Sequence, residues 1–116
     1  MAETHPPIFM TKQTQIQLAE SIFEECIATL KTKGDDYASK EDALANFKRN
    51  AERLGMTKYQ VWLLYFTKHV DAIINSVKRD PTCPQVESEP IRSRVVDNIN
   101  YLILFAALME EDGTTA

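Results

Sequence analysis

Residues 90–111 read PIRSRVVDNINYLILFAALMEE, and this stretch decides the class of fold that the sequence predicts. Pro90 suits the first position of a helix, where its missing N–H costs nothing. From Tyr101 to Met109 the stretch is apolar on nearly every side, so other helices or a partner chain must surround it. Apolar residues recur along it at three- and four-residue steps, as on one side of an α-helix, at Ile91, Val95, Ile99, Leu102, Ala106 and Met109.

Three further helices are predicted upstream. The first is expected over about Thr11 to Lys33 and is ended by Gly34. The second begins near Ser39, in a near capping box with Asp42, and is closed by Gly55. The third starts at the capping-box pair Thr57 and Gln60 and reaches about Arg79. One apolar stripe is expected along the first helix, at Ile16, Ala19, Ile22, Phe23, Cys26, Ile27 and Leu30.

The 116 residues have room for one domain, and 3 glycines and 5 prolines favour a few long elements over many short strands. We therefore expect an all-α, four-helix bundle-like domain that assembles as a homo-oligomer. Within the single domain 1–116, residues 1–10 are expected to form an N-terminal arm, 80–89 an exposed proline-containing loop and 112–116 a tail.

Charge and cysteine content exclude several classes of protein. Thirteen basic and 17 acidic residues give a net charge of −4, which argues against general nucleic-acid binding. Cys26 and Cys83 have no further ligand at metal-site spacing and suit a reducing cytoplasm. The start of the chain lacks the pattern of a signal peptide, and 101–109 is too short to span a membrane. The prediction is a cytoplasmic protein without a membrane partner.

Each group of acidic residues near the first helix has a structural and a ligand-binding interpretation. Asp35 and Asp36 follow its expected C-terminus, where the helix dipole disfavours negative charge, so they are either turn residues or contacts to a metal, ribose or base. Tyr37 would offer a stacking surface beside them. Glu20, Glu24 and Glu25 either reach one cation or form an exposed helix face.

Polar residues on the last two helices also leave alternatives open. Lys68, Asp71 and Asn75 form a polar strip, and an ion pair between Lys68 and Asp71 would account for two of them. His69 is expected to be a satisfied core residue. Arg94, Asp97, Asn98 and Tyr101 gather on one side of a helix that should be largely buried. Because buried polar groups need partners, this group indicates either cross-helix hydrogen bonds or a ligand pocket.

Several short motifs carry a family resemblance. They are Lys33-Gly34-Asp35-Asp36-Tyr37, Asn46-Phe47, Lys68-His69-Val70-Asp71, Ser88-Glu89-Pro90-Ile91 and Asp97-Asn98-Ile99-Asn100-Tyr101. In this order they resemble small phage proteins of the nucleotide-modification-associated type. Those are in turn similar to the all-α nucleoside triphosphate pyrophosphohydrolases of the MazG and dimeric dUTPase group. The likeness runs from about Phe23 to Glu110.

The resemblance implies a MazG-like fold in which two acid pairs on facing helices hold Mg²⁺. Glu25 with either Glu24 or Glu20 would supply the first pair, and Asp97 the last acid of the second. Arg94 stands where the partner of Asp97 would lie, and a guanidinium does not ligate a metal, so nucleotide binding is expected without catalysis. The ligand-binding residues predicted from residues and resemblance together are Lys33, Asp35, Asp36, Tyr37, Asn46, Lys68, Asp71, Arg92, Arg94, Asp97, Asn98 and Tyr101.

Three functions are weighed on this basis. The first is a phage-type protein that holds or sequesters a nucleotide or nucleotide-derived signal, as an anti-defence sponge in the host cytoplasm. The second is a Mg²⁺-dependent nucleotide pyrophosphohydrolase. The third is a helical interaction module whose apolar last helix docks a partner protein.

Overall fold

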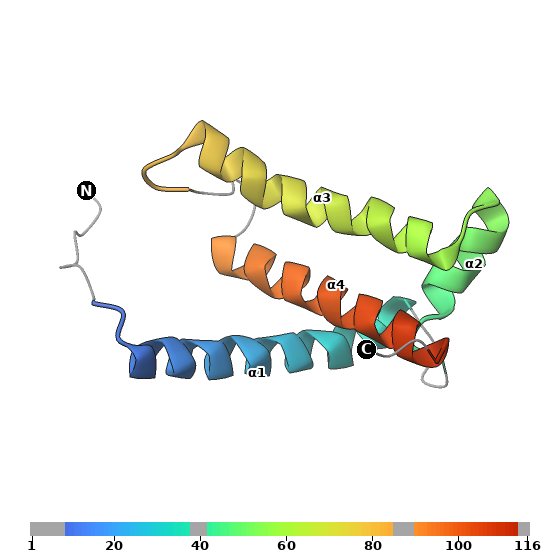
Figure 1. Ribbon diagram of the computed structural model, residues 1–116, viewed down its shortest axis with the longest axis horizontal. Helices are drawn as coiled ribbons and strands as arrows, with labels where there is room; N and C mark the ends of the chain where they lie inside the picture. Colours follow the sequence, from blue (N-terminus) through green and yellow to red (C-terminus); the bar gives the residue numbers. More distant parts are fainter. Residues whose placement is uncertain (1–8, 38–41, 85–89, 114–116) are drawn as a thin grey trace.

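A computed structural model describes residues 9–37, 42–84 and 90–113, and the side chains of 33–37 are not among what it describes. Four helices occur within these ranges, and no strand does (Figure 1). They are α1 (Lys12–Tyr37), α2 (Ala45–Leu54), α3 (Lys58–Arg79) and α4 (Ile91–Glu111). The all-α class is therefore confirmed. None of the described helices combines the length and apolarity needed to cross a membrane.

Helix α4 lies between α1 and α3, as Figure 1 shows. α3 runs antiparallel to α4, so that Trp62 lies near Tyr101 and His69 near Asp97. α1 runs parallel to α4, with Cys26 near Val96 and Asn100. The short α2 crosses the end of the layer and packs on α3, while α1 packs mainly against α4.

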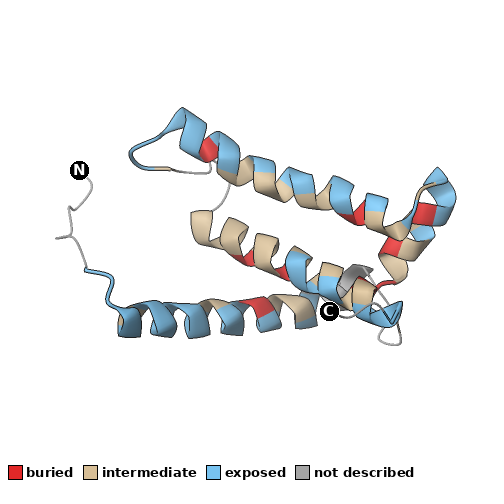
Figure 2. Ribbon diagram, viewed as in Figure 1, coloured by how far each residue is buried: buried red, intermediate tan, exposed pale blue. Residues whose placement is uncertain are grey.

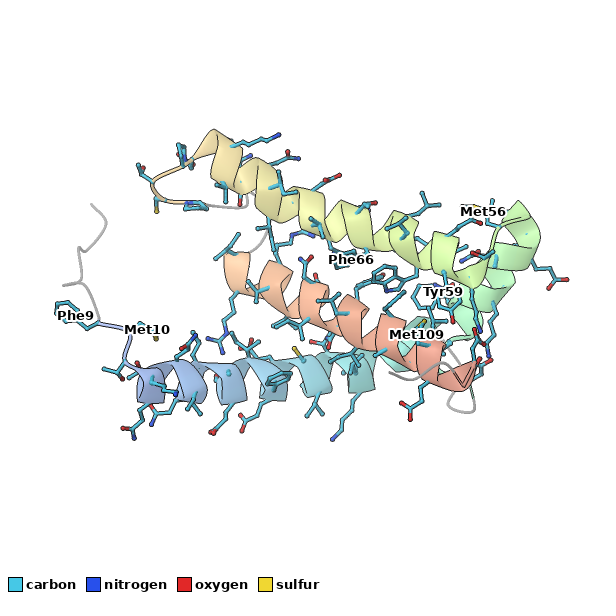
Figure 3. The ribbon with its side chains drawn as sticks, in the orientation of Figure 1. Phe9, Met10, Met56, Tyr59, Phe66 and Met109 are labelled. Atoms are coloured by element: carbon cyan, nitrogen blue, oxygen red, sulfur yellow. The ribbon has the colours of Figure 1, made fainter. Side chains whose placement is uncertain are left out.

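The core is centred where α2, α3 and α4 meet. The Trp62 ring stacks on Phe66 and lies close to Phe105, with both centroid distances 4.7 Å. The indole N–H of Trp62 donates a 2.6 Å hydrogen bond to the backbone oxygen of Tyr101, and Tyr59 and Phe66 project from α3 toward α4 (Figure 3). Burial of apolar side chains of this size supplies most of the stability of such a layer. The buried members of this core are Leu44, Phe47, Ala51, Val61, Trp62 and Leu108.

Two helix ends follow the predicted signals. The Thr57 hydroxyl accepts from the Gln60 N–H and the Gln60 side chain accepts from the Thr57 N–H, which confirms the capping box. Gly55 adopts φ 65° and closes α2 in the left-handed conformation that glycine tolerates.

Three other helix ends differ from the prediction. α1 continues through Gly34 to Tyr37, because a glycine inside a helix costs only about 1 kcal/mol and does not force an end. α2 begins at Ala45, where the Asp42 carboxylate accepts from the Leu44 N–H. Pro90 precedes the first helical residue of α4 instead of occupying that position.

The predicted burial of α1 and α4 is only partly right. In α1 the expected single stripe divides, because Cys26 is fully buried toward α4 whereas Ile16, Phe23 and Ile27 are exposed (Figure 2). In α4 the Leu102 side chain is 52% exposed and Ile103 is exposed as well. One chain thus does not surround the last helix, since α1 and α3 cover only part of its circumference.

A charged cluster joins the C-terminal end of α4 to α2 and α3. Lys48 Nζ lies 3.0 Å from Asp42 Oδ2 and 2.7 Å from Glu111 Oε1, and Lys58 Nζ lies 2.6 Å from Asp112 Oδ1. The hydrogen bond from Lys48 lowers the pKa of Asp42, and the hydrogen bond from Lys58 lowers the pKa of Asp112. Both carboxylates therefore stabilise the folded state in their charged form.

We expect the free energy of unfolding to fall when the pH drops below about 4, the range in which unfolded aspartates take up protons. The sign follows from the lowered pKa values, because the stabilisation is present above the unfolded pKa and is lost as the folded carboxyls become protonated. Urea unfolding at pH 7 and pH 3 measures the loss. Between pH 7 and pH 3 the free energy of unfolding should fall less in the Asp112→Asn variant than in the parent protein. An equal fall in both proteins would contradict the role given to Asp112.

Candidate functional site

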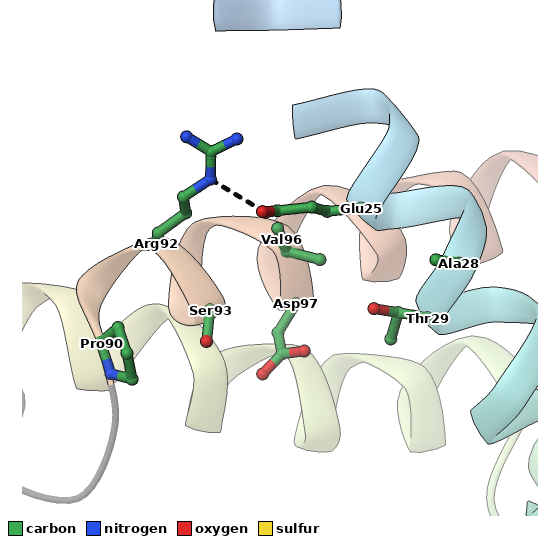
Figure 4. A pocket seen from close by; sticks show the side chains of 8 residues that line it. All are labelled: Glu25, Ala28, Thr29, Pro90, Arg92, Ser93, Val96 and Asp97. Atoms are coloured by element: carbon green, nitrogen blue, oxygen red, sulfur yellow. Dashed lines mark hydrogen bonds and ion pairs between the residues drawn. The ribbon is translucent and has the colours of Figure 1, made fainter. Parts of the chain in front are cut away.

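A pocket of about 490 Å³ lies between α1 and the N-terminal half of α4 (Figure 4). This volume is within the range of small-molecule sites. Its polar groups come from both helices and include one guanidinium, two carboxylates and two hydroxyls. The lining residues are Glu25, Ala28 and Thr29 of α1, and Pro90, Arg92, Ser93, Val96 and Asp97 of α4.

Arg92 bridges the mouth of the pocket. Its Nε donates to Glu25 Oε2 at 2.9 Å and its Nη2 donates to Ser21 Oγ at 2.7 Å. The side chains of the Arg92–Glu25 pair are 40% and 49% exposed, so water screens this ion pair and its contribution to stability is small. An incoming anion would therefore displace Glu25 from the guanidinium at little cost.

Asp97 is held differently, on the side of α4 that faces α3. Its Oδ2 lies 3.8 Å from His69 Nδ1, and both side chains are mostly buried. The His69 ring in turn lies 4.6 Å from the Tyr101 ring. Asn98 fixes the neighbouring backbone by donating to the oxygens of His69 and Arg94. The pocket carboxylate thus lies beside the contact between α3 and α4.

The contact between α1 and α4 next to the pocket contains a buried amide and a buried thiol. Asn100 Nδ2 donates to the Cys26 backbone oxygen at 3.2 Å, while Asn100 Oδ1 is buried without a hydrogen-bond partner. Burial, with the charges of Glu25 and Asp97 adding to it, raises the pKa of the Cys26 thiol. A thiol that stays protonated is a poor nucleophile, so Cys26 serves packing and not covalent chemistry.

The structure brings only some of the predicted ligand-binding residues to this pocket. Arg92 and Asp97 line it, and Glu25, predicted as a metal ligand, joins them. Arg94, Asn98 and Tyr101 belong to α4 but are not among the lining residues.

The other predicted residues lie elsewhere or outside the described side chains. Asn46 is on α2, where its Oδ1 accepts from Arg49 and Asn50, and Lys68 and Asp71 are exposed on α3. The backbone from Lys33 to Tyr37 is helical, as expected for Lys33, so the interpretation of Asp35 and Asp36 as turn residues is wrong. Their side chains lie outside the described residues.

The predicted metal ligands are divided as well. Glu25 and Asp97 both line the pocket, whereas Glu20 and Glu24 are exposed on α1 and do not. In the part of the chain that the structure describes, no three histidine, cysteine, aspartate or glutamate side chains gather as a metal site requires. A cation in this pocket would therefore meet two carboxylates, those of Glu25 and Asp97, on facing helices.

Sequence reasoning missed the hydroxyls that accompany these charges. Ser21 bonds Arg92, and Thr29 and Ser93 line the pocket. A signal was present, because Ser21, Glu25 and Thr29 follow at four-residue steps and so form a polar strip along one side of α1.

Comparison with known proteins finds no matching family model, no similar curated protein and no similar solved structure. The likeness to phage nucleotide-modification-associated proteins thus stays an expectation from short motifs.

Proposed function

We propose that this protein binds a nucleotide or a nucleotide-derived signal in the pocket between α1 and α4 and holds it without cleaving it. The observation that carries the proposal is the meeting of Arg92, Glu25 and Asp97 with two hydroxyls in one pocket of about 490 Å³. A phosphate binds a guanidinium, and ribose and base form hydrogen bonds with carboxylates and hydroxyls. Such a protein would act as a sponge for its ligand, the role suggested by the phage resemblance.

The chemistry of the lining assigns a part of the ligand to each side of the pocket. A phosphate would pair with Arg92, whose planar guanidinium binds phosphate oxygens through charge-assisted hydrogen bonds. Arg92 and Ser93 lie in the first turn of α4, where the positive end of the helix dipole favours an anion. The carboxylate of Asp97 would accept hydrogen bonds from ribose hydroxyls, and the hydroxyl of Thr29 would donate one to a ribose oxygen. Ala28 and Val96 supply apolar contact.

A Mg²⁺-dependent pyrophosphohydrolase is the second candidate, because Glu25 and Asp97 stand on facing helices of the same pocket. Phosphoanhydride hydrolysis relies on metal charge to stabilise the transition state. Arg94 takes the position where the resemblance implies another acid, so the pocket offers a cation two carboxylates where two acid pairs would be needed. This donor set favours binding over hydrolysis.

The proposed binder is a homo-oligomer. A single chain leaves large apolar side chains uncovered on several helices, including Phe23 of α1, Leu64 of α3 and Leu102 of α4. Exposed apolar surface of this kind is characteristic of protein–protein interfaces.

We expect Arg92→Ala to weaken nucleotide binding about tenfold to a hundredfold, because it removes a charge-assisted hydrogen bond worth about 1.5–3 kcal/mol. Calorimetric titration with a panel of nucleoside mono-, di- and triphosphates measures the change. Arg53→Ala, at an exposed arginine of α2, is the matched control and should bind as the parent protein does. Equal affinity of the Arg92 and Arg53 variants would place the ligand outside this pocket.

The same samples distinguish binding from hydrolysis. After incubation with Mg²⁺, chromatography should recover the nucleotide intact, and its affinity should not change on adding EDTA. Release of monophosphate and pyrophosphate, abolished by Asp97→Asn, would replace the binding proposal by the enzyme. An absence of binding to every nucleotide tested would favour the protein-interaction module.

A further inference from the structure

The pocket between α1 and α4 is lined by more acidic than basic side chains. Among the described residues that line it, Arg92 is the one cation, whereas Glu25 and Asp97 are carboxylates. The sequence of α1 adds no base nearby, because residues 13–30 contain three glutamates and neither lysine nor arginine. A ligand with many negative charges would therefore be repelled by most of the charged groups that surround it.

The positive charge at the N-terminal end of α4 matches a single phosphate group. Arg92 lies in the first turn of this helix, where the dipole adds about half a positive charge to that of the guanidinium. A phosphate monoester carries a charge of about −1.5 to −2 at pH 7. One such group therefore neutralises this end of the pocket. Each further phosphate adds negative charge that no second lining cation among the described residues balances.

The opposite end of the pocket is placed for a sugar bonded directly to that phosphate. Asp97 follows Arg92 in α4, and their positions in the sequence separate their backbones by about 7.5 Å along the helix axis. Figure 4 shows the Asp97 carboxylate apart from the Arg92–Glu25 pair, in the pocket that Thr29 also lines. The 5′-phosphate and the ribose hydroxyls of one nucleotide span a comparable distance. Phosphate and sugar of a single nucleotide can therefore engage both ends of the pocket.

We infer that the ligand is a nucleoside monophosphate, and that Glu25 selects it over the triphosphate. Glu25 Oε2 accepts from Arg92 Nε at 2.9 Å, and the glutamate side chain is 49% exposed. A phosphate can therefore take its place on the guanidinium while the carboxylate turns to water. The displaced carboxylate still stands at the mouth of the pocket, where it repels phosphates beyond the first. The inference rests on the proposed function and narrows its ligand to one class of nucleotide.

Calorimetric titration in EDTA, repeated in Mg²⁺, tests the inference. The probes are the mono- and triphosphates of the common ribonucleosides and deoxyribonucleosides. For the nucleoside that binds best, the monophosphate should bind about tenfold tighter than the triphosphate, because the two further phosphates are repelled at short range. A triphosphate that binds equally or more tightly in either buffer would overturn the inference and leave nucleotide binding intact. Failure of every probe to bind would instead overturn the proposed function, and this inference with it.

The Glu25→Gln variant tests the part assigned to the carboxylate. Glutamine keeps the length of the side chain and an oxygen that accepts from Arg92, but it removes the negative charge. The preference for the monophosphate should shrink from about tenfold to about threefold, because one of the two repelling charges is gone. Glu52→Gln removes the same charge at an exposed position of α2 and should keep the preference of the parent protein. An unchanged preference in Glu25→Gln, or an equal shift in Glu52→Gln, would contradict the selection by Glu25.

The salt dependence of the preference provides a check that needs no variant. Dissolved salt screens exposed charges, and the screening length falls from about 10 Å at 0.1 M to about 3 Å at 1 M ionic strength. The preference of the parent protein for the monophosphate should therefore diminish over this range of sodium chloride. A preference that salt does not change would mean that the pocket rejects the triphosphate by its size, and it would overturn the role of Glu25.

Discussion

The Trp62→Ala variant is expected to lose about 3–5 kcal/mol of its free energy of unfolding, which is a large part of the roughly 5–15 kcal/mol that a domain possesses. Trp62 is buried, stacks on Phe66, lies against Phe105, and donates a hydrogen bond to the backbone of α4. Its removal opens a cavity between α3 and α4 and takes away a hydrogen bond that joins them. Urea unfolding followed by circular dichroism measures the loss.

Trp62→Phe is the matched variant, because it keeps an aromatic ring and removes the indole N–H. It should be destabilised by about 1–3 kcal/mol, the cost of a lost buried hydrogen bond together with a smaller cavity. Comparable stability of the alanine variant and the parent protein would show that the contact between α3 and α4 does not depend on this residue.

The second large effect is expected at Asn100, in the contact between α1 and α4. Asn100→Asp should cost about 3–5 kcal/mol at pH 7, since it buries a carboxylate where the amide now donates to the Cys26 backbone oxygen. Asp97, one turn earlier on the same helix, adds repulsion. Asn100→Leu keeps the size of the side chain and removes the unpartnered Oδ1, so it should remain within about 1.5 kcal/mol of the parent protein.

The pH dependence of the aspartate variant provides an independent check. Burial raises the pKa of a carboxyl in the folded state. The free-energy cost of burying its charge therefore disappears as the pH falls toward the pKa of the unfolded state. The difference between Asn100→Asp and the parent protein should therefore shrink between pH 7 and pH 4. A constant difference would mean that the new side chain has moved into water.

The sequence predicts the helices well where a local signal ends them. The Thr57–Gln60 capping box and Gly55 act through bonds and dihedral angles of neighbouring residues, so the boundary between α2 and α3 is readable from the chain. Gly34 was likewise expected to end a helix, yet it lies inside α1. The small free-energy cost of Gly34 inside a helix is outweighed by the packing and length of the whole of α1. No local sequence pattern shows these two quantities.

The burial pattern was less predictable for a physical reason. Helical spacing shows which apolar residues share a side, but not how many neighbours that helix has. Cys26 and Phe23 both fit the stripe expected on α1, and the structure buries one and exposes the other. The candidate site was also only partly predictable, because Arg92 and Asp97 share α4 and were predicted, whereas Thr29 joins them only through the parallel pairing of α1 with α4.

That parallel pairing has a kinetic consequence. The contacts of α2 with α3, and of α3 with α4, join neighbours along the chain, whereas Cys26 meets Val96 and Asn100 only after a loop of most of the domain has closed. In an isolated chain we expect α1 to dock last and to detach first. Its backbone amides from Lys12 to Glu20 should exchange with deuterium at rates near those of an unstructured peptide, while amides around Trp62 and Leu108 exchange only on global unfolding.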